Sequence, residues 1–290
     1  ADSLTLLGDF SEGRNLLQTG APNISFRMER RPDGFYQTAY DRTALRSRTE
    51  RFDLVVGSGK IGQTYLYWRD GILFELPVSW LSGARRWINS PGYVDGTVDF
   101  ERVVVPRCLE CHATRFTVDT SQGTARARYS SDYMLGVSCA NCHGDGHAHV
   151  AWHTANPEDS VARDIVNPGR LPRERQLDNC GLCHGGPRDP KRPAGTYRGG
   201  EPLDDWFQPA ADANDPKPDV HGNQLALMRR TPCFRASPAM TCTSCHDPHV
   251  MERDLGRLAE RCLACHEAAS HPGADRLGSR LQAECIDCHM

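Results

Sequence analysis

The chain has 290 residues and a formal charge of −3, from 34 basic and 37 acidic side chains. This length allows one large or two ordinary domains, and the charge gives no basis for nucleic-acid binding, which needs a basic surface. No apolar run reaches the roughly 18 residues of a transmembrane helix, so none is expected. The mean hydropathy is negative, so the side chains alone offer little apolar area for a core of this size.

Residues 1–105 contain neither cysteine nor histidine, and their patterns predict an antiparallel β domain. Ile24, Phe26 and Met28 alternate with polar residues, and turn-forming residues 31–34 join this run to residues 35–40 in a hairpin. Strand-forming runs at 52–56, 63–69 and 72–76 predict a second meander. Its last two strands are joined by Asp70-Gly71, a strong signal for a two-residue hairpin turn.

A glycine-rich segment, residues 57–62, matches the pattern GxGxxG between two of these predicted strands. A dinucleotide site needs that pattern to open a helix after a strand, whereas a strand follows here at once. We therefore interpret the segment as a β-turn. Farther along, Trp80, Trp87 and Tyr93 are predicted to form a packing surface rather than a ligand site.

Six CxxCH motifs follow between residues 108 and 289. Two cysteines three positions apart can each form a thioether with a haem vinyl group, and the adjacent histidine then binds the iron. A lone CxxC equally suits half of a zinc ribbon or a redox pair, but six copies, each followed by histidine, favour six covalently bound haem c groups. The motifs are Cys108/Cys111/His112, Cys139/Cys142/His143, Cys180/Cys183/His184, Cys242/Cys245/His246, Cys262/Cys265/His266 and Cys285/Cys288/His289.

The haem motifs define a second predicted domain, residues 106–290, of short helices and irregular segments. With the β domain this gives an α+β chain whose haem groups supply most of the second core, so folding should depend on haem insertion. Helical spacing is expected at Leu255, Leu258, Ala259 and Cys262, and again at Leu277, Leu281, Cys285 and Cys288. The Pro- and Gly-rich segment 185–220 is predicted to be an ordered wrapping loop, because Tyr197, Trp206 and Phe207 give it something to bury.

Six further histidines match the number of irons, and none of them lies in residues 1–105. We predict them as second axial ligands: His147, His149, His153, His221, His249 and His271. His149, His249 and His271 follow a motif so closely that they can hardly reach the far face of their own haem, so each should bind a neighbouring one. His147 and His153 are the least constrained, because three ligands within seven residues require two or three haems to converge.

One cysteine, Cys233, lies outside the motifs. It is predicted to be a buried thiol, with an intermolecular disulfide or a haem contact as alternatives. Haem of this type is attached outside the cytoplasmic membrane, and Ala1-Asp2-Ser3 fits the start of a mature chain left by a signal peptidase. A periplasmic or extracellular protein is expected. Met290 directly follows the last motif, which fits either a natural end or a missing C-terminal part.

Three segments carry a family resemblance: CHGDGHAH at 142–149, CTSCHDPH at 242–249 and CIDCHM at 285–290. Residues 105–290 resemble the multihaem cytochromes c related to the tetrahaem cytochrome of ammonia oxidisers, hydroxylamine oxidoreductase and the pentahaem nitrite reductases. The resemblance implies that His149 and His249 are distal ligands and that haems stack in parallel and perpendicular pairs. The chain has no CxxCK motif, so nitrite reduction is not implied, and the β domain has no counterpart there.

The function expected from these features is electron transfer through bis-histidine haems, without catalytic residues. The protein would act as a soluble carrier or as the subunit of a conductive polymer, with a redox protein or a neighbouring copy as partner. The alternative is an oxidoreductase in which one haem keeps an open site for a small nitrogen or sulfur oxo species. That alternative gains support if His147 or His153 does not bind iron, and Arg126, Arg128, Arg229 and Arg230 would then be available for an anion.

Overall fold

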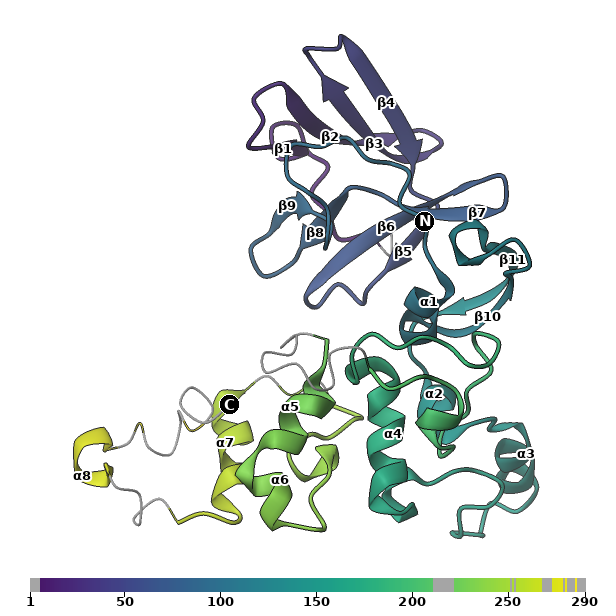
Figure 1. Cartoon of the computed structure of the whole chain (residues 1–290), viewed down its shortest axis with the longest axis vertical. Coiled ribbons are helices and arrows are strands. Elements are labelled where there is room, and N and C mark those ends of the chain that lie inside the picture. The colour runs from purple at the N-terminus through teal and green to yellow at the C-terminus, as the bar shows by residue number, and fades with distance from the viewer. Residues whose placement is uncertain are drawn as a thin grey trace. The chain divides into compact units, whose positions relative to one another are not determined.

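The computed structural model describes residues 6–210, 222–250, 252, 254–267, 273–278, 280 and 285. It confirms the α+β class, because antiparallel sheets in the N-terminal region are followed by short helices (Figure 1). The chain divides into two compact units. Unit 1 comprises residues 1–141 and 192–197, and unit 2 comprises residues 142–191 and 198–290. Within the described residues, no helix is both long and apolar enough to cross a membrane.

Unit 1 consists mainly of strands. They are β1 (Leu16–Gln18), β2 (Ile24–Arg31), β3 (Gly34–Asp41), β4 (Arg46–Arg51), β5 (Leu54–Val56), β6 (Gly62–Arg69), β7 (Ile72–Glu75), β8 (Val78–Leu81), β9 (Arg86–Asn89), β10 (Ala113–Asp119) and β11 (Arg128–Leu135). Helix α1 (Pro106–His112) and the 3₁₀ turn η1 (Thr124–Arg126) interrupt them.

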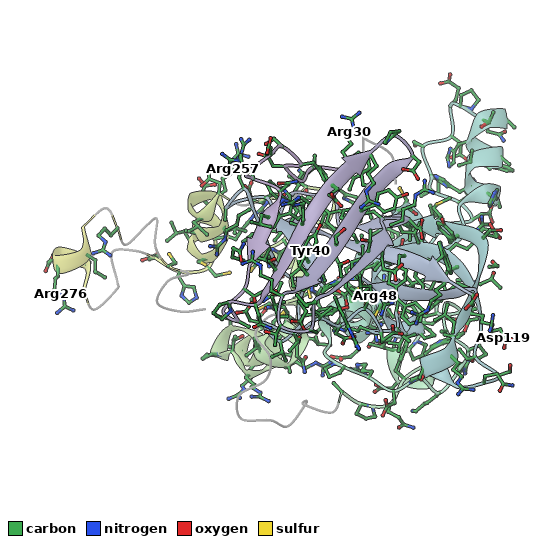
Figure 2. All side chains as sticks on the ribbon, turned by 90° about the horizontal axis from the view of Figure 1, so that it is seen from above. Arg30, Tyr40, Arg48, Asp119, Arg257 and Arg276 are labelled. Atoms are coloured by element: carbon green, nitrogen blue, oxygen red, sulfur yellow. The ribbon has the colours of Figure 1, made fainter. Side chains whose placement is uncertain are left out.

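The first sheet has the strand order β1-β2-β3-β4 and confirms the predicted hairpin at residues 24–40. Strand β4 was not predicted, because its sequence RSRTER has no apolar residue and its side chains are exposed or half-buried. It pairs with β3 along its whole length and forms one edge of the sheet. Figure 2 looks onto this sheet and shows Tyr40 on β3 and Arg48 on β4.

The second sheet has the order β10-β11-β7-β6-β8-β9, and β5 pairs with β6 beside that path. The Asp70-Gly71 turn between β6 and β7 is confirmed. Both residues have left-handed backbone angles, with φ of 53° and 77°, as a type I′ turn requires. Residues 57–61 connect the antiparallel strands β5 and β6, and β6 begins at Gly62, so the interpretation of this segment as a turn between strands is confirmed.

A hydrophobic core lies where side chains of β2 and β3 meet those of β6 to β9. Trp80 and Trp87 are buried in it, which confirms their packing role. The amide of Gln37, which is fully buried, crosses from β3 to β8: its Nε2 donates to the Val78 carbonyl oxygen and its Oε1 accepts from the Val78 amide, at 3.1 and 3.0 Å. Both polar groups are therefore satisfied inside the core.

A second hydrophobic cluster extends unit 1 past the first CxxCH motif. Leu109 of α1 and Phe116 of β10 pack there with Leu66 of β6 and Tyr129 of β11. The strand pair β10–β11 was not predicted, and it joins the second sheet through the pairing of Arg128 with Ile72. Helix α1 is thus packed as part of unit 1, while the predicted division at residues 105/106, which follows the distribution of haem ligands, stays a prediction.

The chain passes from unit 1 to unit 2 within α2 (Cys139–His143). The later elements are α3 (His147–Ala155), η2 (Pro168–Arg170), α4 (Arg173–His184), η3 (Leu203–Asp205), α5 (Gln224–Arg230), α6 (Pro232–Ala236), η4 (Cys242–Ser244), α7 (Leu255–Leu263) and α8 (Ala274–Leu277). Helix α4 is the longest of these, and Leu177 on it is fully buried.

The predicted wrapping loop is confirmed for residues 185–210, where Phe207 is buried and pairs with Pro190 in an isolated β-bridge. The predicted helix around Leu258 is also confirmed as α7, whose first turn is capped by the Asp254 carboxylate. The second helical pattern is described only at Leu277, the last residue of α8, and at Cys285. Its other two residues, Leu281 and Cys288, lie outside the described residues.

Candidate haem sites

The described CxxCH motifs adopt helical turns, which brings their ligands together. Residues at i, i+3 and i+4 share one helix face, so the two cysteines and the histidine of each motif point the same way. In the fourth and fifth motifs, which lie on η4 and at the end of α7, the turn is closed by bonds from His246 N to Cys242 O at 2.9 Å and from His266 N to Cys262 O at 3.0 Å. The described motif cysteines are all at least partly accessible.

The first motif lies on α1 in unit 1. Pro106 starts the helix, a position where the missing N–H costs nothing. Glu110, between the two cysteines, is buried and accepts a hydrogen bond from Gly195 N at 3.2 Å, and burial raises the pKa of its carboxyl. Partial removal from water also lowers the pKa of His112, which favours the neutral imidazole that iron binding requires.

The second motif lies on α2 and is held by two backbone contacts. His143 Nδ1 lies 2.7 Å from the Val166 carbonyl oxygen, and because a carbonyl only accepts, Nδ1 carries the proton and Nε2 is the nitrogen left to bind a metal. Segment 198–200 also runs directly past Cys142. A Cβ on Gly199 would lie 2.2 Å from the Cys142 carbonyl oxygen, so only glycine fits there.

The third motif forms the last turn of α4, and its residues differ in exposure. Cys180 and Cys183, the two predicted attachment residues, are both half-buried. His184, the predicted iron ligand at the end of the helix, is exposed. The histidine of this turn is therefore more accessible to solvent than its two cysteines. Haem attachment through Cys180 and Cys183 stays a prediction.

The residues around this motif let other segments approach it. A Cβ on Gly181, between its two cysteines, would lie 3.1 Å from Leu225 and 3.2 Å from Leu203, so the missing side chain lets α5 and η3 pack closely against the motif. Asn179, one residue before the motif, accepts from Gly200 N at 2.8 Å. The turn is thus held from three segments of unit 2.

In unit 2, motifs that follow one another in the sequence also contact one another in space. Asn179 joins the third motif to the second, because its Nδ2 donates to Cys142 O at 3.4 Å. The third motif in turn contacts the fourth. The thiols of Cys180 and Cys242 are hydrogen-bonded, which lowers the pKa of Cys242 to about 7 before any thioether forms.

The last three motifs continue this series. Cys245 of the fourth motif lies within electrostatic range of Cys265 of the fifth. Cys262, also of the fifth motif, is hydrogen-bonded to Cys285 of the sixth. The second to sixth motifs therefore form one continuous series.

The rings of His143 and His249 are neighbours and nearly parallel. Their centroids are 6.1 Å apart and their planes differ by 17°. Two imidazoles that bind one metal from opposite sides, with bonds of about 2 Å, have centres about 6 Å apart. The pair therefore fits the axial ligands of a single iron, with His143 as the motif ligand and His249 as the second. That His249 serves a haem other than its own stays a prediction.

Helix α3 carries three further candidate ligands. His149 Nδ1 lies 2.8 Å from the Arg163 carbonyl oxygen, which leaves Nε2 for a metal. His153, one turn later, has a buried Nε2 without a hydrogen-bond partner, and its ring centroid is 4.6 Å from that of His149. The two rings are too close to bind one iron from opposite sides. His147 differs, because its side chain is 96% exposed and its Nδ1 contacts Asp145 at 2.5 Å.

Four predicted site residues lie outside the described residues: His221, His271, Cys288 and His289. Cys233 is described, and the prediction that it is buried was wrong: it is exposed on α6. It lies within electrostatic range of Cys245 and Cys262. Proline at the first position and arginine in the last turn make α6 a short surface helix.

The residues that orient the ligands were not predicted. Two of them, Val166 and Arg163, act through backbone carbonyls, for which the side-chain sequence holds no signal. Asn141 was not predicted either, although its side chain accepts from Ser138 N at 2.8 Å and donates to Ala113 O at 3.2 Å, which fixes the start of α2 within unit 1. The sequence hint to this role of Asn141 was its position between the two cysteines of the second motif.

One family of known proteins matches part of this site. A family model described as cytochrome c554 and c-prime matches residues 89–144, from the end of β9 to the end of α2, including the first two CxxCH motifs. No curated protein matches the chain. Among solved structures, the outer cell wall cytochrome OcwA is similar at 19% identity with a TM-score of 0.46, covering 74% of this chain and 56% of that one.

The chain thus spans a little over half the length of that structure. The family match falls on two complete CxxCH motifs, whose cysteines and histidine share one helix face in the structure. The family match and the geometry of its two motifs together support a c-type cytochrome with covalently bound haem and a role in haem-based electron transfer.

Proposed function

We propose that this protein conducts single electrons through six covalently bound c-type haems, each closed by two histidines. The observation that carries the proposal is the pair of nearly parallel rings of His143 and His249, whose centroid spacing suits two ligands of one iron. An iron with both axial positions filled can pass electrons but cannot bind a substrate. The continuous series of motifs in unit 2 supports the same function, because electron transfer requires neighbouring haems.

The setting of this function is also part of the proposal. Attachment of haem c takes place outside the cytoplasmic membrane, so the protein acts in the periplasm or beyond the cell. Its partner is a redox protein or a neighbouring copy of the same chain. It works as a discrete carrier or as the subunit of a conductive filament, and sedimentation of the haem-loaded protein separates these two forms.

The test uses His249→Met, with Val250→Met as the matched control, since Val250 is exposed and the control keeps both histidines. His249→Met should retain six haem units in the intact mass, lose one bis-histidine signal in electron paramagnetic resonance, and raise one reduction potential, as methionine ligation does. Val250→Met should match the unmodified protein. An unchanged spectrum in His249→Met would contradict the assignment of His249.

A second function, an oxidoreductase with one open haem, is favoured by one feature of unit 1. His112 is the sole histidine in residues 1–141 and 192–197, so unit 1 itself contains no second histidine for the first haem. Resonance spectra of the oxidised protein separate the two functions. A high-spin signal equal to one haem, which shifts when nitrite, sulfite or cyanide is added, would favour the enzyme.

A further inference from the structure

Unit 1 contains a half-buried carboxyl group, that of Glu75, which haem attachment does not use. Glu75 is the last residue of β7, and its side chain is 17% exposed. Its backbone is fixed on both sides, because Glu75 N donates to Arg102 O at 2.9 Å and Glu75 O accepts from the Tyr93 hydroxyl at 2.6 Å. Among the described residues, the carboxylate has one ionic partner, Arg102, at 3.3 Å.

The arginine is only partly available to this carboxylate. Arg102 also donates to the Pro91 carbonyl oxygen and lies over the Tyr93 ring, 5.0 Å from its centroid. Burial therefore outweighs the attraction to Arg102 and raises the pKa of Glu75 to about 7. A group in this range changes its charge near neutral pH in response to a small change in the local field.

The first haem motif begins six residues after Arg102, whose carbonyl oxygen is hydrogen-bonded to Glu75 N. Partial removal from water raises the pKa of the Cys108 thiol, and the negative charge of Glu75 adds to this rise. The titratable and charged groups around Glu75 are thus Arg102 and Tyr93 from the segment after β9 and Cys108 from α1. Two more distant groups, Asp99 and Tyr67, act on Tyr93.

We propose that Glu75 takes up a proton when the haem attached at Cys108 and Cys111 is reduced. This inference rests on the proposed function. The donor supplies one electron, which converts ferric to ferrous iron, and the Glu75 carboxylate accepts one proton from the solvent. Reduction removes one positive charge near the carboxylate, so the proton binds more tightly. By reciprocity, the protonated carboxyl raises the potential of that haem.

The experiment compares haem-loaded wild-type protein, Glu75→Gln and the control Glu101→Gln. Glu101 is paired with Arg48 and Arg69, and these arginines lower its pKa to about 2, so it stays ionised throughout the test. Each protein is reduced electrochemically between pH 6 and 8 in weak buffer with an indicator dye. Wild type and Glu101→Gln should take up close to one more proton per molecule than Glu75→Gln. In those two proteins only, the reduction potential of one haem should fall by up to about 59 mV per pH unit.

Equal proton uptake in all three proteins would overturn the proposal. Arg102→Gln is a second variant should Glu75→Gln fail to fold. Loss of the positive charge should move the pH range of proton uptake to higher pH. An unchanged pH range would also contradict the role of Glu75. Intact mass and resonance spectra of the same samples report haem number and spin state. A failure of the proposed function appears there and not in the proton count.

Discussion

Units 1 and 2 bury very different amounts of apolar side chain. Unit 1 contains both hydrophobic clusters, one between its two sheets and one around α1 and β10. In the described part of unit 2, seven apolar side chains are buried: Leu177, Leu182, Leu203, Phe207, Ala210, Leu225 and Ala259. Burial of apolar area is the main force that opposes the loss of chain entropy on folding, so the units should differ in how they are stabilised.

The helices of unit 2 cannot make up the difference by themselves. The longest, α4, has 12 residues, and isolated helices of this length are marginal in water. Segments of unit 2 are instead held together by close backbone packing around the motifs, such as that of Gly199 against Cys142. Covalent haem would add large apolar faces at those same points. Unit 1 should therefore fold by its own sequence, and unit 2 should fold together with its cofactors.

The largest expected effect follows from removing haem altogether. In protein produced without haem attachment, amides of the strands in unit 1 should remain protected from hydrogen exchange, while amides of residues 142–191 and 198–290 should exchange as in an unfolded chain. Limited proteolysis should cut in the same ranges. Equal protection of both units would show that unit 2 has a sufficient core without haem.

The same difference explains how far the sequence alone could predict the fold. Hairpins such as β2–β3 and β6–β7 were predictable, because apolar alternation and turn residues act locally. Strand β4 was not predictable, since its polar residues pair with β3 without facing a core. The pair β10–β11 was missed because it follows a haem motif yet joins a sheet made mostly of earlier residues.

The candidate site divides in the same way. The covalent attachment residues follow from spacing, which is local. The pairing of His143 with His249 depends on residues more than 100 positions apart, and the sequence indicated that His249 serves another haem without indicating which. Glu75 had no sequence signal at all, because its importance comes from its partial burial, its contact with Arg102 and its electrostatic effect on Cys108.

A matched pair of glycine variants sharpens the comparison at single positions. A Cβ on Gly62 in β6 would lie 2.5 Å from the Trp80 carbonyl oxygen, a clash of the same kind as that of Gly199 with Cys142. We expect Gly62→Ala to lower the free energy of unfolding of unit 1 by about 1–3 kcal/mol and to leave the haem number unchanged. Gly199→Ala should instead yield protein that lacks one haem.

The readouts for this pair are thermal unfolding and intact mass. Gly146→Ala is the control for unit 2, because nothing lies within 4 Å of a Cβ at that position, and it should keep every haem. Loss of haem in Gly62→Ala, or a full haem complement in Gly199→Ala, would contradict the separation of roles between the two units.

The smallest expected effect concerns how the stability of unit 1 depends on pH, measured in the haem-free protein. The pKa of Glu75 is raised from 4.5 to about 7 in the folded state, so between these values the unfolded chain has lost the proton and the folded chain retains it. Folding then becomes less favourable as pH rises from 4.5 to 7, by up to about 3 kcal/mol, and stays so above pH 7.

Urea unfolding at pH 4.5 and pH 8 measures this difference for the wild type and for Glu75→Gln. The glutamine cannot ionise, so the variant should lose most of the fall in stability and be more stable than wild type at pH 8, although it gives up the ion pair with Arg102. Glu101→Gln is the control, and it should show the same fall between pH 4.5 and 8 as the wild type. Arg48 and Arg69 lower the pKa of Glu101, so its contribution is present above pH 4.5 and is lost in more acidic solution. Because Glu101 is 56% exposed, that contribution should be at most about 1 kcal/mol. If wild type and Glu75→Gln show the same fall between pH 4.5 and 8, the carboxyl of Glu75 is ionised in folded unit 1 at neutral pH.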